Sequence, residues 1–481
     1  MKNKIFICLL MTVVMQATAQ VKDYGKYYND LPVKMKQVSM PQIPHYQVLL
    51  TDFGAVGDGL TLNTEAFRKA IDALSTKGGG KLIVPAGLWL TGPIALKSNV
   101  ELHLERNAVI YMSEDKRLFI NPENSTGQCL SGISATDCQN IAITGEGIID
   151  GNGTEWRYAK HGKMSDVEWN ALKRRGGFIT DDGKRWYAWK MKHGLPDIAS
   201  SPEEQETQRA DLVRFYHCKN ILLSGVTVQN SPRFHIHPYY CKNIIIDGIN
   251  VICPWNAQNG DGIDLSDCQQ VLIVNTTIDV GDDGFCLKSS KPHKTFDSGN
   301  EDILIQDNLV RHAHGGFVLG SNTTSGMRRL VCRHNTFTQT YAGLRFKSSI
   351  GRGGLIKQVY IDDIMMTDIQ LNAITFQCDY VKNAADDSKE RYKNPDYVNG
   401  FSEKERRYTP DFQDIHISNV VCKNARTAIE ATGLTGLNCV HDVTLTDCIF
   451  IYTQRGNAIH EPTAKLKLKN VRFVKLGEEV K

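Results

Sequence analysis

The chain has 481 residues, of which 41% are hydrophobic and 23% charged, and its formal net charge is +3. This composition provides enough apolar material for a large core and excludes wholesale disorder. The charge is too close to zero for a typical nucleic-acid-binding protein. We therefore expect no nucleic-acid partner, and any anionic ligand must be bound by local basic clusters.

The N-terminus has the pattern of a secretory signal peptide. Lys2 and Lys4 precede the apolar stretch 5–14, and Ala19 ends a run of small residues where cleavage is expected. Residues 1–19 are interpreted as the signal and residues 20–50 as an N-terminal arm. We expect export to the periplasm or the exterior. No stretch supplies the roughly 20 apolar residues of a membrane span.

A single amphipathic helix is predicted after a turn-rich entry at 51–59. It should begin at Asn63 or Thr64 and end before Gly78, and its apolar residues follow helical spacing: Ala66, Phe67, Ala70, Ile71 and Leu74. One helix in front of a β-rich chain predicts a cap over the first coil of a solenoid.

Short strands with a repeating unit are predicted beyond residue 80. A polar residue followed by an apolar triplet begins at 220, 243, 270 and 302, and similar units continue toward the C-terminus. Such a repeat predicts a solenoid, and its β form is a parallel β-helix. Residues 51–481 are expected to form one all-β catalytic domain, with long loop insertions near 154–209 and 380–410.

Tryptophans and cysteines in this domain each allow two interpretations. The first insertion contains four tryptophans that could stack on sugar rings or pack a small core of the insertion itself: Trp156, Trp169, Trp186 and Trp189.

Four cysteines stand just before apolar runs: Cys138, Cys218, Cys241 and Cys268. A ladder of buried thiols is favoured over metal binding for these four, because the sequence has no short Cys-x-x-Cys pair.

Charged residues gather in four clusters between 259 and 347. Asp261 comes first, Asp282 and Asp283 follow, and then come His314 and, two residues apart, Arg345 and Lys347. Their spacing suggests one coil per step, and successive coils lie about 4.8 Å apart. The side chains could therefore line one groove.

Three clustered carboxylates suit glycosidic hydrolysis, in which one acid protonates the leaving oxygen and another activates water. Crowding should keep one of them protonated near neutral pH, and the two cations could bind an acidic sugar. Each Asp-Gly cluster alone equally predicts a turn, and Asp264 and Asp267 are expected to be turn or surface residues. Asp282 and Asp283 can share one face only if a bulge or turn redirects one of them.

These clusters resemble the four signatures of glycoside hydrolase family 28, the polygalacturonases and related pectin hydrolases. The family's Asn-Thr-Asp, Asp-Asp, Gly-His-Gly and Arg-Ile-Lys stand here as Asn259-Gly260-Asp261, Asp282-Asp283, Ala313-His314-Gly315 and Arg345-Phe346-Lys347. The resemblance covers nearly everything after the signal. It implies a right-handed, single-stranded parallel β-helix.

The resemblance also implies roles for these residues. Asp282 would be the general acid, Asp261 and Asp283 would activate water, and His314 would support protonation of the acid. Arg345 with Lys347 would hold the substrate carboxylate. The family inverts the anomeric configuration, which predicts carboxyl separations of roughly 6.5–9.5 Å. No metal or organic cofactor is implied.

Three further residues are candidates for substrate binding by the same resemblance. His237 and Asn259 would contact sugar, and Lys288 resembles a lysine of exo-acting members. The long insertions also resemble those that close one end of the groove in exo-acting members.

The predicted function is an exo-acting, inverting polygalacturonase that cleaves α-linked galacturonic acid in pectin, and a monomer is expected. A rhamnogalacturonan or xylogalacturonan hydrolase of the same family is the first alternative. A β-helix pectate lyase and a non-catalytic carbohydrate-binding protein remain as further alternatives.

Overall fold

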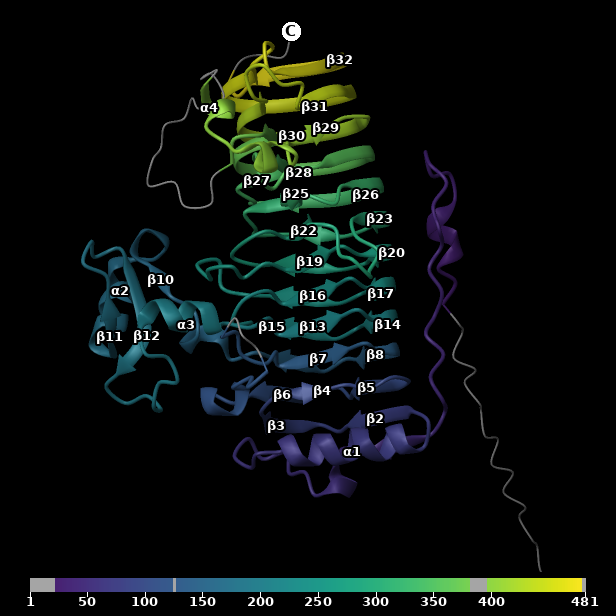
Figure 1. The fold of residues 1–481 in the computed structure, drawn as a ribbon, viewed down its shortest axis with the longest axis vertical. Helices are drawn as coiled ribbons and strands as arrows, with labels where there is room; N and C mark the ends of the chain where they lie inside the picture. Colours follow the sequence, from purple (N-terminus) through teal and green to yellow (C-terminus); the bar gives the residue numbers. More distant parts are fainter. Residues whose placement is uncertain (1–21, 124–126, 381–395, 478–481) are drawn as a thin grey trace, which may run out of the picture.

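A computed structural model describes residues 22–123, 127–380 and 396–477, so the predicted signal peptide lies outside the described residues. The body is a right-handed parallel β-helix whose coils stack along one axis, with 29 strands joined in parallel (Figure 1). This confirms the predicted fold class. Among the described residues, no helix is both long and apolar enough to cross a membrane.

Three ladders of parallel strands form the walls of the solenoid. The ladder that carries the charged clusters comprises β4 (Ile94–Ala95), β7 (Ile133–Thr136), β13 (Val213–Tyr216), β16 (Ile236–Tyr239), β19 (Ile263–Ser266), β22 (Phe285–Ser289), β25 (Gly315–Thr323) and β27 (Ala342–Lys347). The second ladder begins with β1 (Gln47–Leu49), β2 (Gly80–Val84), β5 (Val100–Leu104), β8 (Gln139–Gly145), β14 (Lys219–Ser224), β17 (Lys242–Asp247), β20 (Gln269–Val274) and β23 (Asn300–Gln306). The third comprises β3 (Gly87–Thr91), β6 (Ala108–Met112), β9 (Ile148–Asp150), β15 (Thr227–Gln229), β18 (Asn250–Ile252), β21 (Thr277–Asp279) and β24 (Leu309–Val310).

Longer strands merge these walls toward the C-terminus. They are β26 (Met327–Thr338), β28 (Leu355–Gln377), β30 (Ile415–Thr432), β31 (Val440–Ile459) and β32 (Ala464–Lys475), with the short β29 (Asp411–Phe412) beside them. Of the second predicted insertion, residues 381–395 lie outside the described residues. The rest contains α4 (Asp396–Asn399) and α5 (Glu403–Arg406).

The repeated polar residue of the sequence forms a corner of each coil. Asn220, Asn243 and Gln270 have φ angles of 57°, 58° and 58°, in the left-handed region that asparagine tolerates better than most residues. Their side chains also form a ladder, because Asn243 donates to the Asn220 amide oxygen at 2.9 Å and Asn220 to that of Asn140 at 2.9 Å. The corner explains why a polar residue recurs before each apolar triplet.

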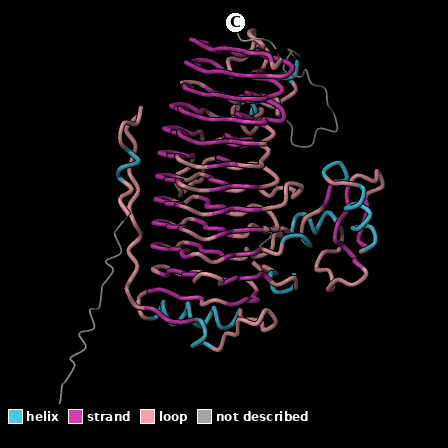
Figure 2. The backbone as a smooth tube through the Cα atoms, turned by 180° about the vertical axis from the view of Figure 1, so that it is seen from behind, coloured by secondary structure: helices cyan, strands magenta, loops and turns pink. Residues whose placement is uncertain are grey.

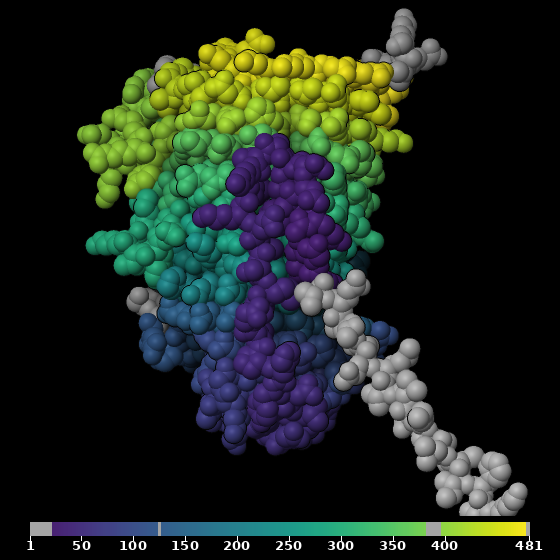
Figure 3. Space-filling model, turned by 90° about the vertical axis from the view of Figure 1, so that its right-hand side faces the viewer, coloured from purple at the N-terminus to yellow at the C-terminus, as the bar shows by residue number. Residues whose placement is uncertain are grey.

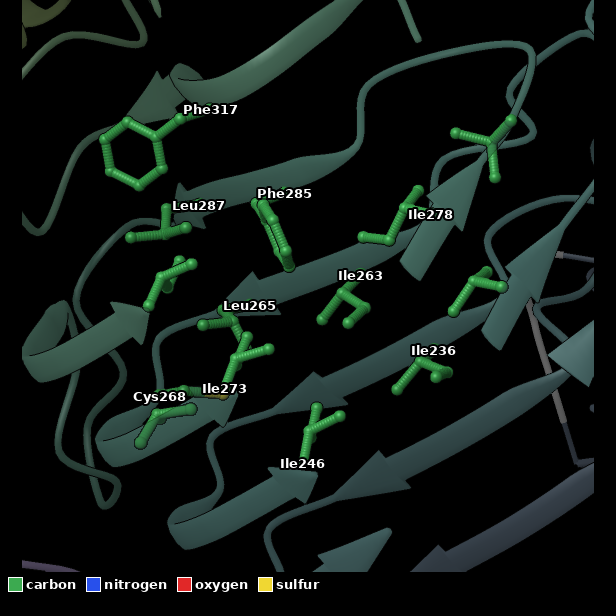
Figure 4. Close-up of a cluster of buried hydrophobic side chains, with 14 of the residues drawn as sticks. Ile236, Ile246, Ile263, Leu265, Cys268, Ile273, Ile278, Phe285, Leu287 and Phe317 are labelled. Atoms are coloured by element: carbon green, nitrogen blue, oxygen red, sulfur yellow. The ribbon is translucent and has the colours of Figure 1, made fainter. Parts of the chain in front are cut away.

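Apolar side chains stack in register inside the coils. Ile236, Ile263, Phe285 and Phe317 are paired between successive strands and fully buried (Figure 4). The four cysteines of the predicted ladder are free thiols, and the Cys218 amide lies 3.4 Å from the Cys241 sulfur. Cys218, Cys241 and Cys268 are buried in the main core, and the partly buried Cys138 packs against it, so these cysteines have a structural role.

Helix α1 (Thr64–Thr76) covers the first coil beside β2 and β3 (Figure 1). It buries the five apolar residues expected from the sequence. Asn63 stands at its N-cap position, but its side chain does not cap the helix. Instead it accepts from the Val56 amide at 2.8 Å and donates to the Leu90 carbonyl at 3.2 Å, so it fastens the entry turn to the first coil.

Residues 153–208, which we call the insertion lobe, project from the side of the solenoid (Figures 1 and 2). The lobe contains η4 (Gly153–Glu155), β10 (Ala159–Lys160), η5 (His161–Lys163), α2 (Asp166–Arg174), β11 (Gly176–Ile179), β12 (Arg185–Met191) and α3 (Pro202–Gln208), and its three strands are antiparallel. Trp169 and Trp186 are buried in the lobe's own core, and Trp156 packs edge-on against Phe119. Packing, rather than sugar stacking, accounts for these three tryptophans.

The N-terminal segment from Lys22 to Tyr46 runs along the outside of the solenoid (Figure 3). It contains η1 (Gly25–Tyr28) and precedes η2 (Leu50–Phe53), while η3 (Lys116–Phe119) belongs to an early coil. Tyr24, Tyr27 and Met35 pack on outward-facing apolar residues of the second ladder: Ala142, Leu222, Ile245, Leu272, Val274, Leu304 and Val331. The Tyr24 hydroxyl donates to Asp247 at 2.9 Å.

Candidate active site

The three predicted aspartates lie on turns that lead into neighbouring strands. Asp261 stands two residues before Ile263 and Asp283 two residues before Phe285, and these two strand residues are paired. Asp282 lies in the bend before β22, outside the strand, so it can face the same way as Asp283. Each of the three carboxyl groups has an oxygen within 4.8 Å of the other two.

These distances join the nearest oxygens, whereas the roughly 6.5–9.5 Å expected for an inverting pair is the separation of whole carboxyl groups. The expected separation therefore stays a prediction. Positive charge built in among the carboxylates offsets their mutual repulsion. Lys347 donates to Asp283 at 2.6 Å, and the Lys288 ammonium lies 3.5 Å from Asp261.

The three carboxyl groups differ in exposure. The Asp282 side chain is 13% exposed, whereas those of Asp261 and Asp283 are 5% and 4% exposed. Within the described part of the chain, Oδ1 of Asp261 and Oδ1 of Asp283 are buried without a hydrogen-bond partner. Unsatisfied buried oxygens require an explanation, and an ordered water or a ligand would provide it.

Arg345 and Lys347 point from the same face of β27 toward Asp283. One Arg345 guanidinium nitrogen lies 3.8 Å from Asp283 Oδ1, whereas Lys347 forms the close ion pair with Oδ2. The Tyr380 ring lies 5.6 Å from the Arg345 guanidinium and 5.3 Å from the Lys347 ammonium. The structure thus brings both predicted cations to the carboxylates.

Lys288 also belongs to this cluster. Its ammonium forms an ion pair with Asp264 and lies 2.8 Å from the Cys286 sulfur. The expectation that Asp264 is a turn or surface residue is wrong, because it lies within β19 with its side chain completely buried and paired with Lys288. Asp267 does lie at a turn, as expected, but it is buried there and accepts from the backbone amides of Ser290 and Gly299.

Two groups of residues have the spacing of metal ligands: Asp261 with Asp264 and Cys286, and Asp261 with Asp282 and Asp283. A lysine ammonium already contacts each group of potential ligands. Lys288 contacts the first group and Lys347 contacts the second. The negative charge of each group is thus offset by a lysine of the same protein.

His314 lies beside the most exposed carboxylate. Its Nδ1 is 3.3 Å from Asp282 Oδ1, and its side chain is 37% exposed, so it faces both the carboxylate and solvent. The Tyr341 ring lies 5.5 Å away, tilted against the imidazole. His314 is thus placed to exchange a proton or a hydrogen bond with Asp282.

Protonation differs within the carboxylate cluster. Burial, with the negative charges of Asp282 and Asp283, raises the pKa of Asp261 to about 8. Burial also acts to raise the pKa of Asp282, but the hydrogen bond and charge of His314, with the charges of Lys347 and Lys163, bring that pKa below its usual value. These opposite shifts indicate that the free protein shares one proton within the cluster, and the coupled carboxyls titrate as a unit.

His237 and Asn259 are held by the protein rather than presented freely. His237 Nδ1 lies 2.6 Å from Asp211 and its Nε2 lies 2.9 Å from the Ser266 hydroxyl, so both ring nitrogens are engaged. The Asn259 amide oxygen accepts from Arg209 at 2.9 Å. The structure does not bring His237 among the carboxylates, and sugar contact by either residue stays a prediction.

The site contains one further residue that no sequence pattern indicated. Lys163, in η5 of the insertion lobe, donates from its ammonium to the Gly281 carbonyl at 3.3 Å, next to Asp282. Burial lowers the pKa of Lys163, and the nearby charges of Asp282, Asp261 and Asp283 oppose this effect. No repeat or motif singles out this lysine, because its position depends on how the lobe folds.

A parallel β-helix with clustered carboxylates, an imidazole and two cations beside them has the arrangement of a carbohydrate-cleaving hydrolase of the solenoid class. Residues 160–390 match the family model described as glycosyl hydrolases family 28. An exopolygalacturonase structure from Thermotoga maritima is 30% identical, with a TM-score of 0.71, and the match covers 91% of this chain and 94% of that one. The chain belongs to glycosyl hydrolases family 28, which confirms the predicted family and the prediction of a glycoside hydrolase.

Two other relatives are similar over much of the chain. An exo-poly-alpha-D-galacturonosidase from Dickeya chrysanthemi is 27% identical over 88% of this chain and 69% of its own length. A probable polygalacturonase from Vitis vinifera is 29% identical over 66% of this chain and 60% of its own length. This chain therefore matches only part of the longer curated relatives.

Proposed function

We propose that this enzyme is an exo-acting polygalacturonase that removes galacturonic acid from a chain end of pectic homogalacturonan, with inversion. The observation that carries the proposal is the group of three carboxyls within 4.8 Å of one another, adjoined by Arg345 and Lys347. A carboxyl cluster alone suits many glycosidases, but the cations add recognition of an acidic sugar. The exo-acting relatives from Thermotoga and Dickeya support action at a chain end.

Asp282 is the proposed general acid. A general acid must reach the glycosidic oxygen, and Asp282 is the most exposed of the three carboxyls. Asp261 and Asp283 are the proposed water-activating pair, since each has an unsatisfied buried oxygen toward which a water could donate. His314 would then regulate the proton on Asp282 through their 3.3 Å contact.

The shared proton connects these roles. The raised pKa of Asp261 favours the proton on that carboxyl in the free enzyme, and a protonated Asp261 cannot act as a base. Transfer of the proton to Asp282 produces the reactive arrangement, with an acid at the leaving oxygen and an ionised base beside the water. One proton within the cluster therefore serves both functions, and the pair titrates as a unit.

Arg345 is the proposed main ligand of the substrate carboxylate. Its guanidinium has five donors, and its contact with Asp283 at 3.8 Å is longer than a hydrogen bond. A uronate could therefore bind Arg345 bidentately while Lys347 keeps its ion pair with Asp283. Lys288, paired with Asp264, would support the site from β22, the strand that follows Asp282 and Asp283.

We also propose an exported monomer with an acidic polysaccharide or oligosaccharide as its partner. The charged and apolar pattern of residues 1–19 supports export. The near-neutral net charge gives no support for a nucleic-acid partner.

Product sizing tests the proposal directly. The enzyme is incubated with homogalacturonan, trigalacturonate and rhamnogalacturonan, and the products are separated by size over time while NMR follows the anomeric proton. Release of monomer alone from the first two, initially as the β-anomer, is expected. A rapid spread of intermediate lengths would refute exo-action, and an unsaturated, ultraviolet-absorbing product would establish lyase chemistry instead.

A further inference from the structure

We propose that Lys163 of the insertion lobe binds the carboxylate of a second uronate, adjacent to the one held by Arg345, so that the enzyme requires two consecutive acidic sugars. This inference rests on the proposed polygalacturonase function and specifies the substrate of the same site. The expected ligand is thus an unesterified stretch of at least two galacturonates.

Two sets of cations approach the carboxylate cluster from different parts of the protein. Arg345 and Lys347 extend from β27, on the coil that follows His314, and contact Asp283. Lys163 extends from the insertion lobe and contacts the carbonyl of Gly281, at the other end of the same bend. Asp282, the proposed acid, lies between Gly281 and Asp283. A sugar on each side of the scissile bond would therefore meet its own cation.

Lys163 has donors to spare for a ligand. An ammonium group has three protons, and the hydrogen bond to Gly281 is the one protein contact found for it among the described residues. The side chain is half-buried, so water competes less than at an open surface. Lys160 lies close to Lys163 and Asp282 and adds to the positive potential on this side.

The lobe is docked firmly enough to fix the position of Lys163. Arg157 donates to the Ser231 carbonyl and, at 2.9 Å, to the Asn230 amide oxygen, both on the turn after β15. Arg209, the residue directly after the lobe, is buried and donates to Asn259 at 2.9 Å and to the Pro232 carbonyl at 3.0 Å. These hydrogen bonds join the lobe to the turn before β16 and to the turn before β19. A cation held in place in this way loses little conformational entropy when a ligand binds.

Two carboxylate contacts discriminate between pectic polymers. Homogalacturonan has a carboxylate on every sugar, whereas the rhamnogalacturonan backbone alternates a uronate with a neutral sugar. A site that holds one uronate on each side of the scissile bond would leave Lys163 without a partner on the alternating polymer. The lobe would thus select homogalacturonan over the alternative substrate within the same family.

The test compares Lys163→Met and Lys163→Gln with the parent and with Lys173→Met, a matched change at an exposed lysine on α2 of the same lobe. Initial rates are measured on trigalacturonate and on trigalacturonates that carry a methyl ester on one sugar only, so that a carboxylate remains for Arg345, together with thermal unfolding of each variant. Because hydrogen bonds between charged groups contribute more than neutral ones, KM for trigalacturonate should rise about tenfold or more in both Lys163 variants. KM for the methyl ester should change less than about twofold in the same variants. Lys163→Arg should restore most of the affinity for trigalacturonate.

The outcomes separate this inference from the proposed function. A parent that releases no galacturonate refutes the proposed function itself. An active parent whose Lys163→Gln variant behaves like Lys173→Met overturns the role of Lys163 alone. Equal losses on the acid and the ester would likewise overturn it, since they would indicate a structural effect on the lobe rather than recognition of charge.

Discussion

The pH dependence of the reaction follows from the proton shared by Asp261 and Asp282. The pKa of Asp261 is raised to about 8, so the cluster retains its proton below about pH 8 and loses it above. The protonated form is the reactive one, and activity is therefore lost as pH rises. With a single titration at pH 8, about one molecule in eleven remains protonated at pH 9, so kcat/KM should fall about tenfold per unit thereafter.

Initial rates on trigalacturonate between pH 4 and 10 measure this fall in kcat/KM, the alkaline limb of the pH profile. Each sample is also returned to pH 6 after incubation, to separate titration from unfolding. Lys288 complicates the assignment, because burial lowers its pKa to about 8 as well. The variant Lys288→Arg keeps a cation that does not titrate in this range, so an alkaline limb that persists in Lys288→Arg belongs to the carboxyl pair.

Two results would refute this reasoning. A tenfold loss per unit beginning near pH 5 would mean that the acid has an ordinary carboxyl pKa of about 4. Disappearance of the alkaline limb in Lys288→Arg would assign the titration to the lysine instead of the carboxyl pair.

Three further changes test other parts of the molecule. Asp282→Asn should lower kcat by about 10²–10⁴-fold, because general acid catalysis is lost, with an unchanged unfolding transition; near-parental hydrolysis would refute its role as the acid. Lys347→Met should destabilise the fold by about 3–5 kcal/mol in urea unfolding, since it leaves the buried Asp283 without its ion-pair partner; a loss below about 1 kcal/mol would show that Asp283 is compensated elsewhere. Phe317→Ala should cost about 3–5 kcal/mol by opening a cavity between coils, and an unchanged midpoint would contradict the close packing of the stack.

Much of the solenoid could be predicted from the sequence because each coil repeats the same local chemistry. The polar residue before each apolar triplet predicts a corner, and Asn220 and Asn243 occupy such corners in the left-handed conformation. The apolar spacing of the first helix likewise matches the face that α1 buries. These signals are local, so a sequence pattern suffices to find them.

Contacts between distant segments were beyond that kind of pattern. Asp264 alternates with apolar residues in β19, and only its pairing with Lys288 explains why a carboxylate is buried there. The closeness of the three aspartates depends on lysines from β22 and β27, and the approach of Lys163 depends on the fold of a lobe without repeats. The order of the charged clusters along the chain predicted the site, whereas their separations required the structure.

The N-terminal segment has a consequence for the order of assembly. Tyr24 reaches Asp247, more than two hundred residues away, and Arg333 donates to the carbonyls of Tyr27 and Asn29 at 3.2 Å. The surface on which the segment packs exists only after the coils from β8 to β26 have formed. Because such non-local contacts form late, the first described stretch of the chain should be the last to dock, so its burial would report that the middle of the solenoid is complete.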